Sequence, residues 1–348
     1  MKKLLLAIAC FALSANLFSQ TYSGPESVVF DAANNRYLIS NNGNNRILAR
    51  SSAGVLTVFT TNIASGPHGL EIVGNTVYAC DGASIKGFDL TSAALVFNVN
   101  VGASFLNGIC TDGVNTLFAT DFTARKVFKI FISTSQFSTF VTGLGPSPNG
   151  IYYDGPGGRL IWCNWGTNAP ITQALLSDSS VSTVTTTTLG NCDGIVRDGA
   201  GNYYVSAWSS NGIWRFNSSF GSPVQVVTAL NSPADIHYNL ANDTLASPNS
   251  GNNTVTFHYF GPPTAVNSIT GKPNNLFLYP NPCSNVVNVK TEAKGEMKLF
   301  NMVGENVGSW MLYIGENKID VANLPKGIYF VQVITEKGIE TRKLTISQ

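Results

Sequence analysis

Charged residues are scarce in this 348-residue chain. Only 12% of the residues are charged, and the formal net charge is +1. A chain with so little excess positive charge attracts phosphate weakly, which argues against nucleic-acid binding. The hydrophobic content of 44% argues equally against a largely disordered chain. What remains is a globular protein rich in Gly, Ser, Thr and Asn, which favours short strands and turns over helices.

Several motifs of common enzyme and metal sites are also missing. No two cysteines form a CxxC pair, which disfavours a structural zinc site, and no GxSxG nucleophile elbow occurs. The three histidines, His68, His237 and His258, leave few options for a Ser–His pair. No run after residue 20 reaches the ~18 consecutive apolar residues of a membrane helix, so we predict no transmembrane segment.

The first 20 residues have the pattern of a secretory signal peptide. A basic start at Met1–Lys3 is followed by the apolar run Leu4–Leu13 and by a small residue, Ser19. Short apolar runs of this kind direct export and are then removed. We therefore expect residues 1–20 to be cleaved, near Ser19 or Gln20.

An odd number of cysteines remains after this cleavage: Cys80, Cys110, Cys163, Cys192 and Cys283. In an exported protein an odd count implies at least one free thiol or an intermolecular bridge. Cys163 ends one expected strand and Cys192 begins another on the next repeat. A disulfide between them is one interpretation, and two buried free thiols are the other.

An internal repeat covers most of the chain. Six similar segments begin at Pro25 (PESVVFD), Pro67 (PHGLEIV), Leu106 (LNGICTD), Pro148 (PNGIYYD), Cys192 (CDGIVRD) and Pro233 (PADIHYN). Their third residues are separated by 42, 39, 42, 44 and 41 positions. Each segment precedes three further short runs of β-branched and aromatic residues, bounded by Gly, Asn and Asp. A period near forty in an all-β sequence predicts one four-stranded propeller blade per repeat.

The predicted fold class is therefore all-β, a six-bladed β-propeller followed by a small C-terminal β-sandwich. Residues 21–264 form the propeller, 265–275 a Pro-, Gly- and Asn-rich linker, and 276–348 the sandwich. The segment Thr264–Ile269 is a candidate for the fourth strand of the last blade.

The residue before each third position points into the mouth of the expected channel. These six residues are Glu26, His68, Asn107, Asn149, Asp193 and Ala234. Asn41, Asp81, Asp121 and Asn164 end the second strands nearby. Carboxylate and amide oxygens are ligands that hard cations prefer, so a cation or small-ligand site is one interpretation. The other is structural, because Asn-Gly and Asp-Gly are common turn dipeptides.

The repeat resembles the regucalcin and gluconolactonase family, over roughly residues 24–260. The most specific portions are Pro148-Asn149-Gly150-Ile151 and Asp193-Gly194-Ile195. That family consists of six-bladed propellers that hold one divalent ion and open sugar lactones. The resemblance implies metal ligation by Glu26, Asn149 and Asp193, and substrate binding by Asn107. Phe105 and Gly108 replace an Arg and an Asp that this family usually has, and NHL-repeat proteins share the blade pattern without catalysis.

The leading functional prediction is a metal-dependent lactone hydrolase in which Asp193 is both ligand and proton acceptor. The predicted substrate-binding residues are His68, Asn107, Asp121, Asn164 and Trp208. Oxygen ligands favour Ca²⁺ as the cofactor, with Mg²⁺ or Mn²⁺ as alternatives. The alternative function is a non-catalytic propeller that binds a glycan, a peptide or a surface partner, and a third is a pure scaffold.

The C-terminal segment is similar to the type A sorting domain of the type IX secretion system. The motifs are Tyr279-Pro280-Asn281-Pro282, Leu299–Gly304, Leu324–Phe330 and the closing Lys343-Leu344. This resemblance implies that the export machinery is a partner and that the protein is secreted or placed on the cell surface. A generic adhesion-like sandwich is the alternative.

Overall fold

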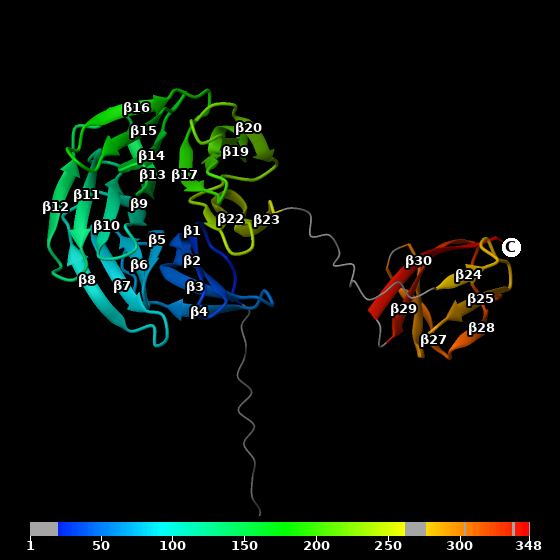
Figure 1. Cartoon of the computed structure of the whole chain (residues 1–348). Helices are drawn as coiled ribbons and strands as arrows, with labels where there is room; N and C mark the ends of the chain where they lie inside the picture. Colours follow the sequence, from blue (N-terminus) through cyan, green and yellow to red (C-terminus); the bar gives the residue numbers. More distant parts are fainter. Residues whose placement is uncertain (1–19, 262–275, 303, 336–337, 348) are drawn as a thin grey trace, which may run out of the picture. The chain divides into compact units, whose positions relative to one another are not determined.

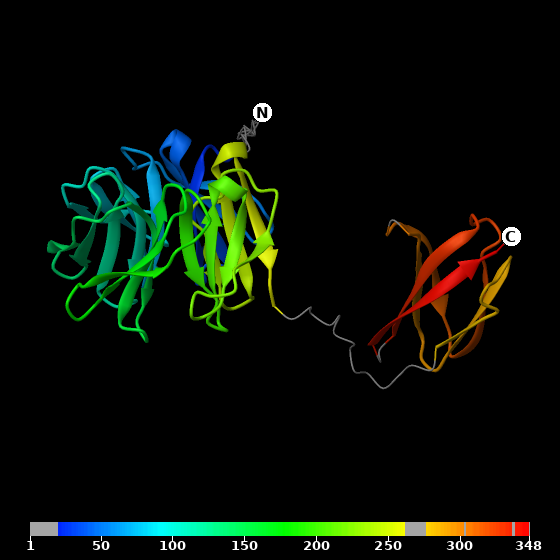
Figure 2. The ribbon, with the colours of Figure 1, turned by 90° about the horizontal axis from the view of Figure 1, so that it is seen from above.

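The structure is a computed structural model that describes residues 20–261, 276–302, 304–335 and 338–347. The described residues form two compact units, one within residues 1–261 and one within 262–348. Each unit is built of β-strands joined by turns (Figures 1 and 2). The predicted signal peptide before Gln20, the linker 265–275 and the candidate strand Thr264–Ile269 lie outside the described residues.

Each repeat of the first unit folds into one antiparallel sheet in chain order. The first sheet contains β1 (Pro25–Asp31), β2 (Arg36–Asn41), β3 (Arg46–Ser51) and β4 (Leu56–Thr60). The second contains β5 (Pro67–Val73), β6 (Thr76–Asp81), β7 (Ser84–Asp89) and β8 (Leu95–Asn100). The third contains β9 (Leu106–Thr111), β10 (Thr116–Asp121), β11 (Lys126–Phe131) and β12 (Phe137–Val141).

The remaining sheets of this unit follow the same order. The fourth contains β13 (Ser147–Asp154), β14 (Arg159–Trp165), β15 (Ile171–Leu175) and β16 (Val181–Thr185). The fifth contains β17 (Cys192–Arg197), β18 (Tyr203–Ala207), β19 (Gly212–Phe216) and β20 (Val224–Val227). The sixth, within the described residues, has three strands: β21 (His237–Asn239), β22 (Thr244–Asn249) and β23 (Thr254–Tyr259). In Figure 1 the sheets are arranged radially, with their first strands nearest the centre.

Glycine at the third position lets neighbouring first strands approach closely. A Cβ atom at Gly150 would lie 2.3 Å from the carbonyl oxygen of Asp193, and one at Gly108 would lie 2.6 Å from that of Asn149. Both glycines lie inside strands, at a bulge in the pairing of the first strand with the second. The Asn-Gly and Asp-Gly pairs are therefore not turns. Their glycines are needed because the backbone of the next sheet occupies the space of a side chain.

In the third, fourth and fifth sheets, a hydroxyl or thiol group on the second strand makes a hydrogen bond to the backbone of the next repeat. Thr120 Oγ1 accepts from the Gly108 N–H at 2.9 Å and donates to the Asn149 carbonyl at 2.8 Å. Ser206 does the same between Gly194 and Ala234, at 2.7 and 2.8 Å. Cys163 takes this place in the fourth sheet, where its Sγ donates to the Asp193 carbonyl at 3.0 Å. The Cys163 thiol therefore replaces the hydroxyl groups of Thr120 and Ser206 as the donor to the next repeat.

All five predicted mature cysteines are buried and free. The interpretation with a Cys163–Cys192 disulfide is wrong, and the alternative with two buried thiols is confirmed. Cys163 makes the hydrogen bond to the next repeat described above, and burial raises the pKa of its thiol well above the ordinary value.

The ring closes through side chains and a short backbone contact between its first and last sheets. Ser27 and Asp235 form an isolated parallel bridge, and the Asp235 N–H donates to the Glu26 carbonyl at 2.9 Å. Ser27 Oγ also donates to Asp235 Oδ2 at 2.8 Å. These two residues stand at the third position, where the other four repeats have glycine.

The hydrophobic core lies between successive sheets. One buried cluster joins Cys80 and Ile85 of the second sheet to Leu117 and Phe128 of the third. Equivalent clusters join the first sheet to the second and the fourth to the fifth. Burying the two faces of each sheet against its neighbours explains why single repeats of this kind need the ring to be stable.

The second unit contains two sheets that share one core. The first consists of β24 (Phe277–Tyr279), β25 (Val286–Thr291) and β28 (Gly315–Asp320). The second consists of β26 (Gly295–Phe300), β27 (Asn306–Leu312), β29 (Gly327–Thr335) and β30 (Gly338–Ile346). Val287 and Val289 of the first sheet and Met297, Leu299 and Val331 of the second are fully buried in the same cluster. Alternating apolar residues on each strand supply this core.

Candidate functional site

Glu26, Asn149 and Asp193 stand at the second position of three first strands, β1, β13 and β17. Asp193 and Asn149 are only 2% and 1% exposed, and Glu26 is half-buried. The Asp193 carboxyl interacts electrostatically with Glu26 and is in hydrogen-bonding proximity to the Asn149 side chain. Ser250, from the sixth sheet's loop, donates from Oγ to Glu26 Oε2 at 3.0 Å. The structure thus brings the carboxyl groups of Glu26 and Asp193 into one neighbourhood.

Burial disfavours negative charge at this place. It raises the pKa of Glu26 to about 7, and the nearby Asp235 adds to the shift while Ser250 opposes it. Burial also raises the pKa of Asp193 well above its usual range, with further increases from the charges of Glu26 and Asp235. Carboxyl groups whose anions are destabilised in this way gain most from a bound cation, which removes their mutual repulsion.

Two buried oxygens of the predicted metal set have no hydrogen-bond partner among the described residues. They are Asn149 Oδ1 and Asp193 Oδ1. The Asn149 amide is oriented by its Nδ2, which donates to the Cys192 carbonyl at 3.3 Å. Buried acceptors left without a donor cost free energy, and a cation offers what they lack. The donor set, two carboxylates and an amide oxygen, therefore fits a hard divalent cation.

The amide oxygen of Asn149 is essential to this set of three cation ligands. Among the described residues, no three His, Cys, Asp or Glu side chains are grouped closely enough to hold a metal ion. Any three-ligand site here must therefore include an oxygen of another residue type, and Asn149 supplies one.

Asp235 is a site residue that the sequence interpretation missed. Its carboxyl is linked to Ser27, and burial raises its pKa to about 7. It also contributes to the raised pKa values of Glu26, Asp193 and Glu71. The signal was an acidic residue at a third position that is elsewhere Gly or Ser. Asp235 adds negative potential to the channel that would attract a cation.

His68 and Asn107 lie at the same second position on β5 and β9. Burial lowers the pKa of His68 to about 4, so the imidazole is neutral at pH 7 and adds no repulsion toward a cation. Its Nε2 lies 2.9 Å from Asn42 Nδ2. Asn107 is 6% exposed, and its side-chain amide has no hydrogen-bond partner within the described part of the chain. That both side chains contact a ligand stays a prediction.

A row of aromatic rings leads from His68 to Trp208, the remaining predicted substrate contact of the mouth. His68 meets Phe105 at 4.6 Å between ring centroids and Phe105 meets Phe122 at 5.7 Å. Phe122 meets Trp165 at 6.0 Å and Trp165 meets Trp208 at 5.1 Å. All four contacts are edge-to-face, and the four aromatic residues after His68 are half-buried. Trp208 lies beside Asp193, whose pKa it lowers.

Asp121 and Asn164 have other partners. The Asp121 carboxylate is fully buried and accepts three backbone N–H bonds, from Ser104 at 2.7 Å, Phe105 at 3.1 Å and Ala124 at 2.8 Å. It therefore holds the loop before β9 in place. The Asn164 side chain is directed toward Pro170 and Thr172, along β15, rather than toward the channel. The structure does not bring these two predicted contacts together with the others.

Glu71 lies near the opposite end of the first strands, in a small cavity of about 190 Å³ that Asp235 and His237 also line. Burial raises its pKa from 4.5 to about 7, although its Oε1 accepts the Ile72 N–H at 2.9 Å. Between these two pH values the folded protein therefore binds more protons than the unfolded chain. Stability from this group is present below about pH 4.5 and is lost as the pH rises through about 7.

Glu71→Gln should consequently flatten the pH dependence of stability. Because Glu71 is half-buried and partly screened, we expect the variant to gain about 1–2 kcal/mol over the wild type above about pH 7. Below about pH 4, where Glu71 is largely protonated in both the folded and the unfolded state, the two proteins should have similar stability. Urea unfolding at several pH values measures the difference, and a variant that is uniformly less stable would contradict the assignment.

Comparison with known families identifies the second unit. Residues 277–347 match the secretion system C-terminal sorting domain. The chain thus carries a type IX sorting domain, and the protein is exported and either secreted or retained at the cell surface. No helix among the described residues is long and apolar enough to cross a membrane.

Comparison with solved structures concerns the first unit. A gluconolactonase from Xanthomonas campestris is similar with a TM-score of 0.57 and 15% identity, over 65% of this chain and 83% of that one. Virginiamycin B lyase from Staphylococcus aureus has a TM-score of 0.52 and 14% identity, over 69% and 85% of the two chains. A chain of the nidogen/laminin complex has a TM-score of 0.52 and 16% identity, over 59% and 80%. No curated protein matches the sequence. At these identities the likeness concerns the propeller-like fold alone.

Proposed function

We propose that this exported protein is a six-bladed propeller that binds one divalent cation and hydrolyses lactones in the manner of a gluconolactonase. The observation that carries the proposal is the pair of unpartnered buried oxygens, Asn149 Oδ1 and Asp193 Oδ1, next to the Glu26 carboxyl. The structural likeness to a gluconolactonase supports it. The proposed mature cargo is residues 21–264, followed by the linker and the sorting domain.

Glu26, Asn149 and Asp193 would hold the cation, with Ca²⁺ favoured over Mg²⁺ or Mn²⁺ by an all-oxygen set. When bound, it supplies Lewis-acid polarisation of a lactone carbonyl and lowers the pKa of water. Asp193, ionised when the cation is bound, would take the proton of the attacking water on the carboxylate oxygen that does not hold the cation. The water oxygen bonds to the carbonyl carbon, the ring C–O bond breaks, and the ring oxygen is protonated to give a hydroxy acid.

His68, Asn107 and Trp208 would position the lactone. The unpaired amide of Asn107 can donate to or accept from substrate hydroxyl groups. The neutral His68 and the half-buried Trp208, which lies beside Asp193, add no charge to the site. Asp121 and Asn164 are left out of this proposed substrate site, because the Asp121 carboxylate accepts from backbone N–H groups and the Asn164 Nδ2 donates to Pro170 and Thr172.

A non-catalytic binding propeller is the second candidate, and the aromatic row from His68 to Trp208 favours it. Half-buried rings on the face of a propeller are suited to packing against a glycan or a peptide. In that case a ligand would bind across the row and would not be consumed.

One experiment separates the two candidates. The mature full-length protein is stripped of metal with a chelator and assayed against a panel of sugar lactones, alone and with added Ca²⁺, Mg²⁺ or Mn²⁺. The enzyme proposal predicts hydrolysis that depends on the cation. Cation binding without hydrolysis of any lactone would favour the binding propeller. If the protein neither binds a cation nor hydrolyses a lactone, the cation site itself is refuted.

Cation affinity should also depend on pH. A cation must displace protons from carboxyl groups whose pKa values burial has raised, such as that of Glu26 at about 7. We therefore expect the affinity for Ca²⁺ to rise with pH over the range in which these carboxyl groups ionise, by up to about tenfold per pH unit for each proton displaced. Calorimetric titrations at several pH values measure this change, and a pH-independent affinity would exclude the buried carboxyl groups as ligands.

A further inference from the structure

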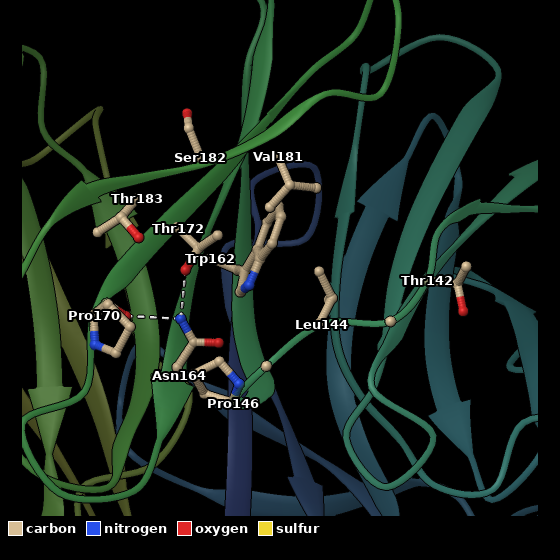
Figure 3. A pocket seen from close by; sticks show the side chains of 12 residues that line it. Thr142, Leu144, Pro146, Trp162, Asn164, Pro170, Thr172, Val181, Ser182 and Thr183 are labelled. Carbon is tan, nitrogen blue, oxygen red and sulfur yellow. Dashed lines mark hydrogen bonds between the residues drawn. The ribbon is translucent and has the colours of Figure 1, made fainter.

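A separate pocket of about 390 Å³ opens beside the fourth sheet, away from the channel residues described above. The loop 142–146, which joins the third sheet to the fourth, forms one wall; β14, β15, β16 and Pro170, just before β15, contribute the other residues. Figure 3 shows Trp162, Asn164 and Thr172 at its base, with Val181 and Ser182 above them. Its volume is within the range of small-ligand sites.

Two buried polar atoms without partners face this pocket. Trp162 Nε1 and Asn164 Oδ1 have no hydrogen-bond partner among the described residues, and their residues are 0% and 1% exposed. In Figure 3 both atoms are directed into the space beside Leu144. One is an obligate donor and the other an acceptor, so a group that binds here must both accept and donate.

The orientation of the Asn164 amide is fixed by its neighbours. Its Nδ2 donates to the Pro170 carbonyl at 2.7 Å and to Thr172 Oγ1 at 2.8 Å. Since a carbonyl only accepts, the nitrogen must point at Pro170 and the oxygen must be the atom that faces the pocket. Thr172 accepts in this bond, which leaves its own hydroxyl hydrogen available as another donor.

The chemistry of the lining residues limits the class of ligand that this pocket can bind. None of the twelve lining residues is charged, so neither an anion nor a cation finds a counter-charge there. The other polar groups are hydroxyls, on Thr142, Thr172, Ser182 and Thr183, and the apolar surface comes from Leu144, Val181 and two prolines. A hydroxyl group can both accept from an N–H such as that of Trp162 and donate to an amide oxygen such as that of Asn164. A neutral, hydroxyl-rich ring with an apolar face matches this lining.

We propose that the pocket beside the fourth sheet is a carbohydrate subsite for neutral saccharides, with Trp162 and Asn164 as its hydrogen-bonding pair. It is independent of the cation site, so sugar should bind there in the presence of a chelator. For an exported protein, it would provide attachment to neutral glycans at a place other than the channel.

The test follows the indole N–H signals of the ¹⁵N-labelled mature full-length protein in ¹H–¹⁵N spectra. The probes are maltose, cellobiose and N,N′-diacetylchitobiose as neutral sugars, and a trialanine peptide, each titrated with chelator present. The expected result is a saturable shift of the Trp162 signal with at least one sugar and none with the peptide. A shift with the peptide alone would overturn the proposal in favour of peptide binding.

Trp162→Phe keeps a buried ring but removes the donor, and should weaken sugar binding about tenfold or more, measured by calorimetry. Trp214→Phe is the matched control, because the Trp214 Nε1 already donates to Ser210 Oγ at 3.0 Å. That variant should bind sugar like the wild type. If no probe shifts the Trp162 signal, the pocket behaves as one that holds ordered water only, and the subsite is refuted. That result would leave the cation proposal untouched.

Discussion

Asp193→Asn should abolish cation binding without unfolding the protein. The substitution removes one of two carboxylates from the proposed ligand set, and we expect the affinity for Ca²⁺ to fall by about 100-fold or more. Any lactone hydrolysis should fall to background, because Asn cannot accept the proton of the attacking water. Because Asn has nearly the same shape as Asp, the loss of cation binding and hydrolysis would come from the site and not from misfolding.

The stability of the metal-free variant is the informative control. Burial and the charges of Glu26 and Asp235 hold the pKa of Asp193 well above its usual range, so the ionised group destabilises the folded state near neutral pH. A neutral Asn removes this cost, and the melting temperature without metal should not fall. The rise in melting temperature that Ca²⁺ gives the wild type should disappear.

Asp178→Asn provides the matched substitution. Asp178 lies in the exposed turn between β15 and β16, where its Oδ1 accepts the Ser180 N–H at 2.9 Å. An Asn retains that acceptor and removes the same unit of charge, so Ca²⁺ affinity should be unchanged. If Asp193→Asn binds Ca²⁺ as tightly as Asp178→Asn does, Asp193 is not a ligand and the catalytic proposal fails.

The repeat contained most of the information about the sheets. A period near forty and short β-branched runs predicted the order of strands, because strand pairing within a meander is local in sequence. The same alignment placed Glu26, Asn149 and Asp193 at equivalent positions of different strands. Equivalent positions on strands around one axis face the same way, which is why the sequence could group them.

The hydrogen-bond partners of the individual polar side chains could not be predicted, because they depend on how the loops and neighbouring strands are arranged. Asn164 lies one residue before the end of β14, and its amide donates to the Pro170 carbonyl and to Thr172 Oγ1. Only the path of the chain into β15 decides this. Asp121 was predicted to meet substrate, but its carboxylate accepts two N–H groups of the loop before β9 and one, from Ala124, of the turn after β10. Short polar side chains next to loops have many local partners, and sequence alone does not rank them.

Cys163 shows the same limit in another form. From the sequence it is a thiol near another thiol, which permits a disulfide. In the fold it occupies a place that Thr120 and Ser206 hold in neighbouring sheets, and its hydrogen bond to the Asp193 carbonyl defines its role. Aligning Thr120, Cys163 and Ser206 within their second strands would have exposed this equivalence.

Gly150→Ala should be among the most destabilising single substitutions in the protein. The added Cβ would lie 2.3 Å from the Asp193 carbonyl oxygen and 2.7 Å from the Gly194 Cα. Both are backbone atoms of the neighbouring first strand, so no side chain can rotate away to relieve the overlap. Overpacking of this kind costs about 3 kcal/mol or more, because β13 and β17 must move apart.

The same movement should weaken the cation site, because Asn149 and Asp193 are carried by the two strands that separate. Gly199→Ala is the control, since a Cβ there meets only Leu240 Cδ2 at 4.0 Å, an ordinary contact. Urea unfolding and Ca²⁺ calorimetry of both variants measure the two effects. If Gly150→Ala were as stable as Gly199→Ala, the close approach of first strands would not be what requires glycine at the third position. The spacing of the channel carboxyl groups would then need another physical cause.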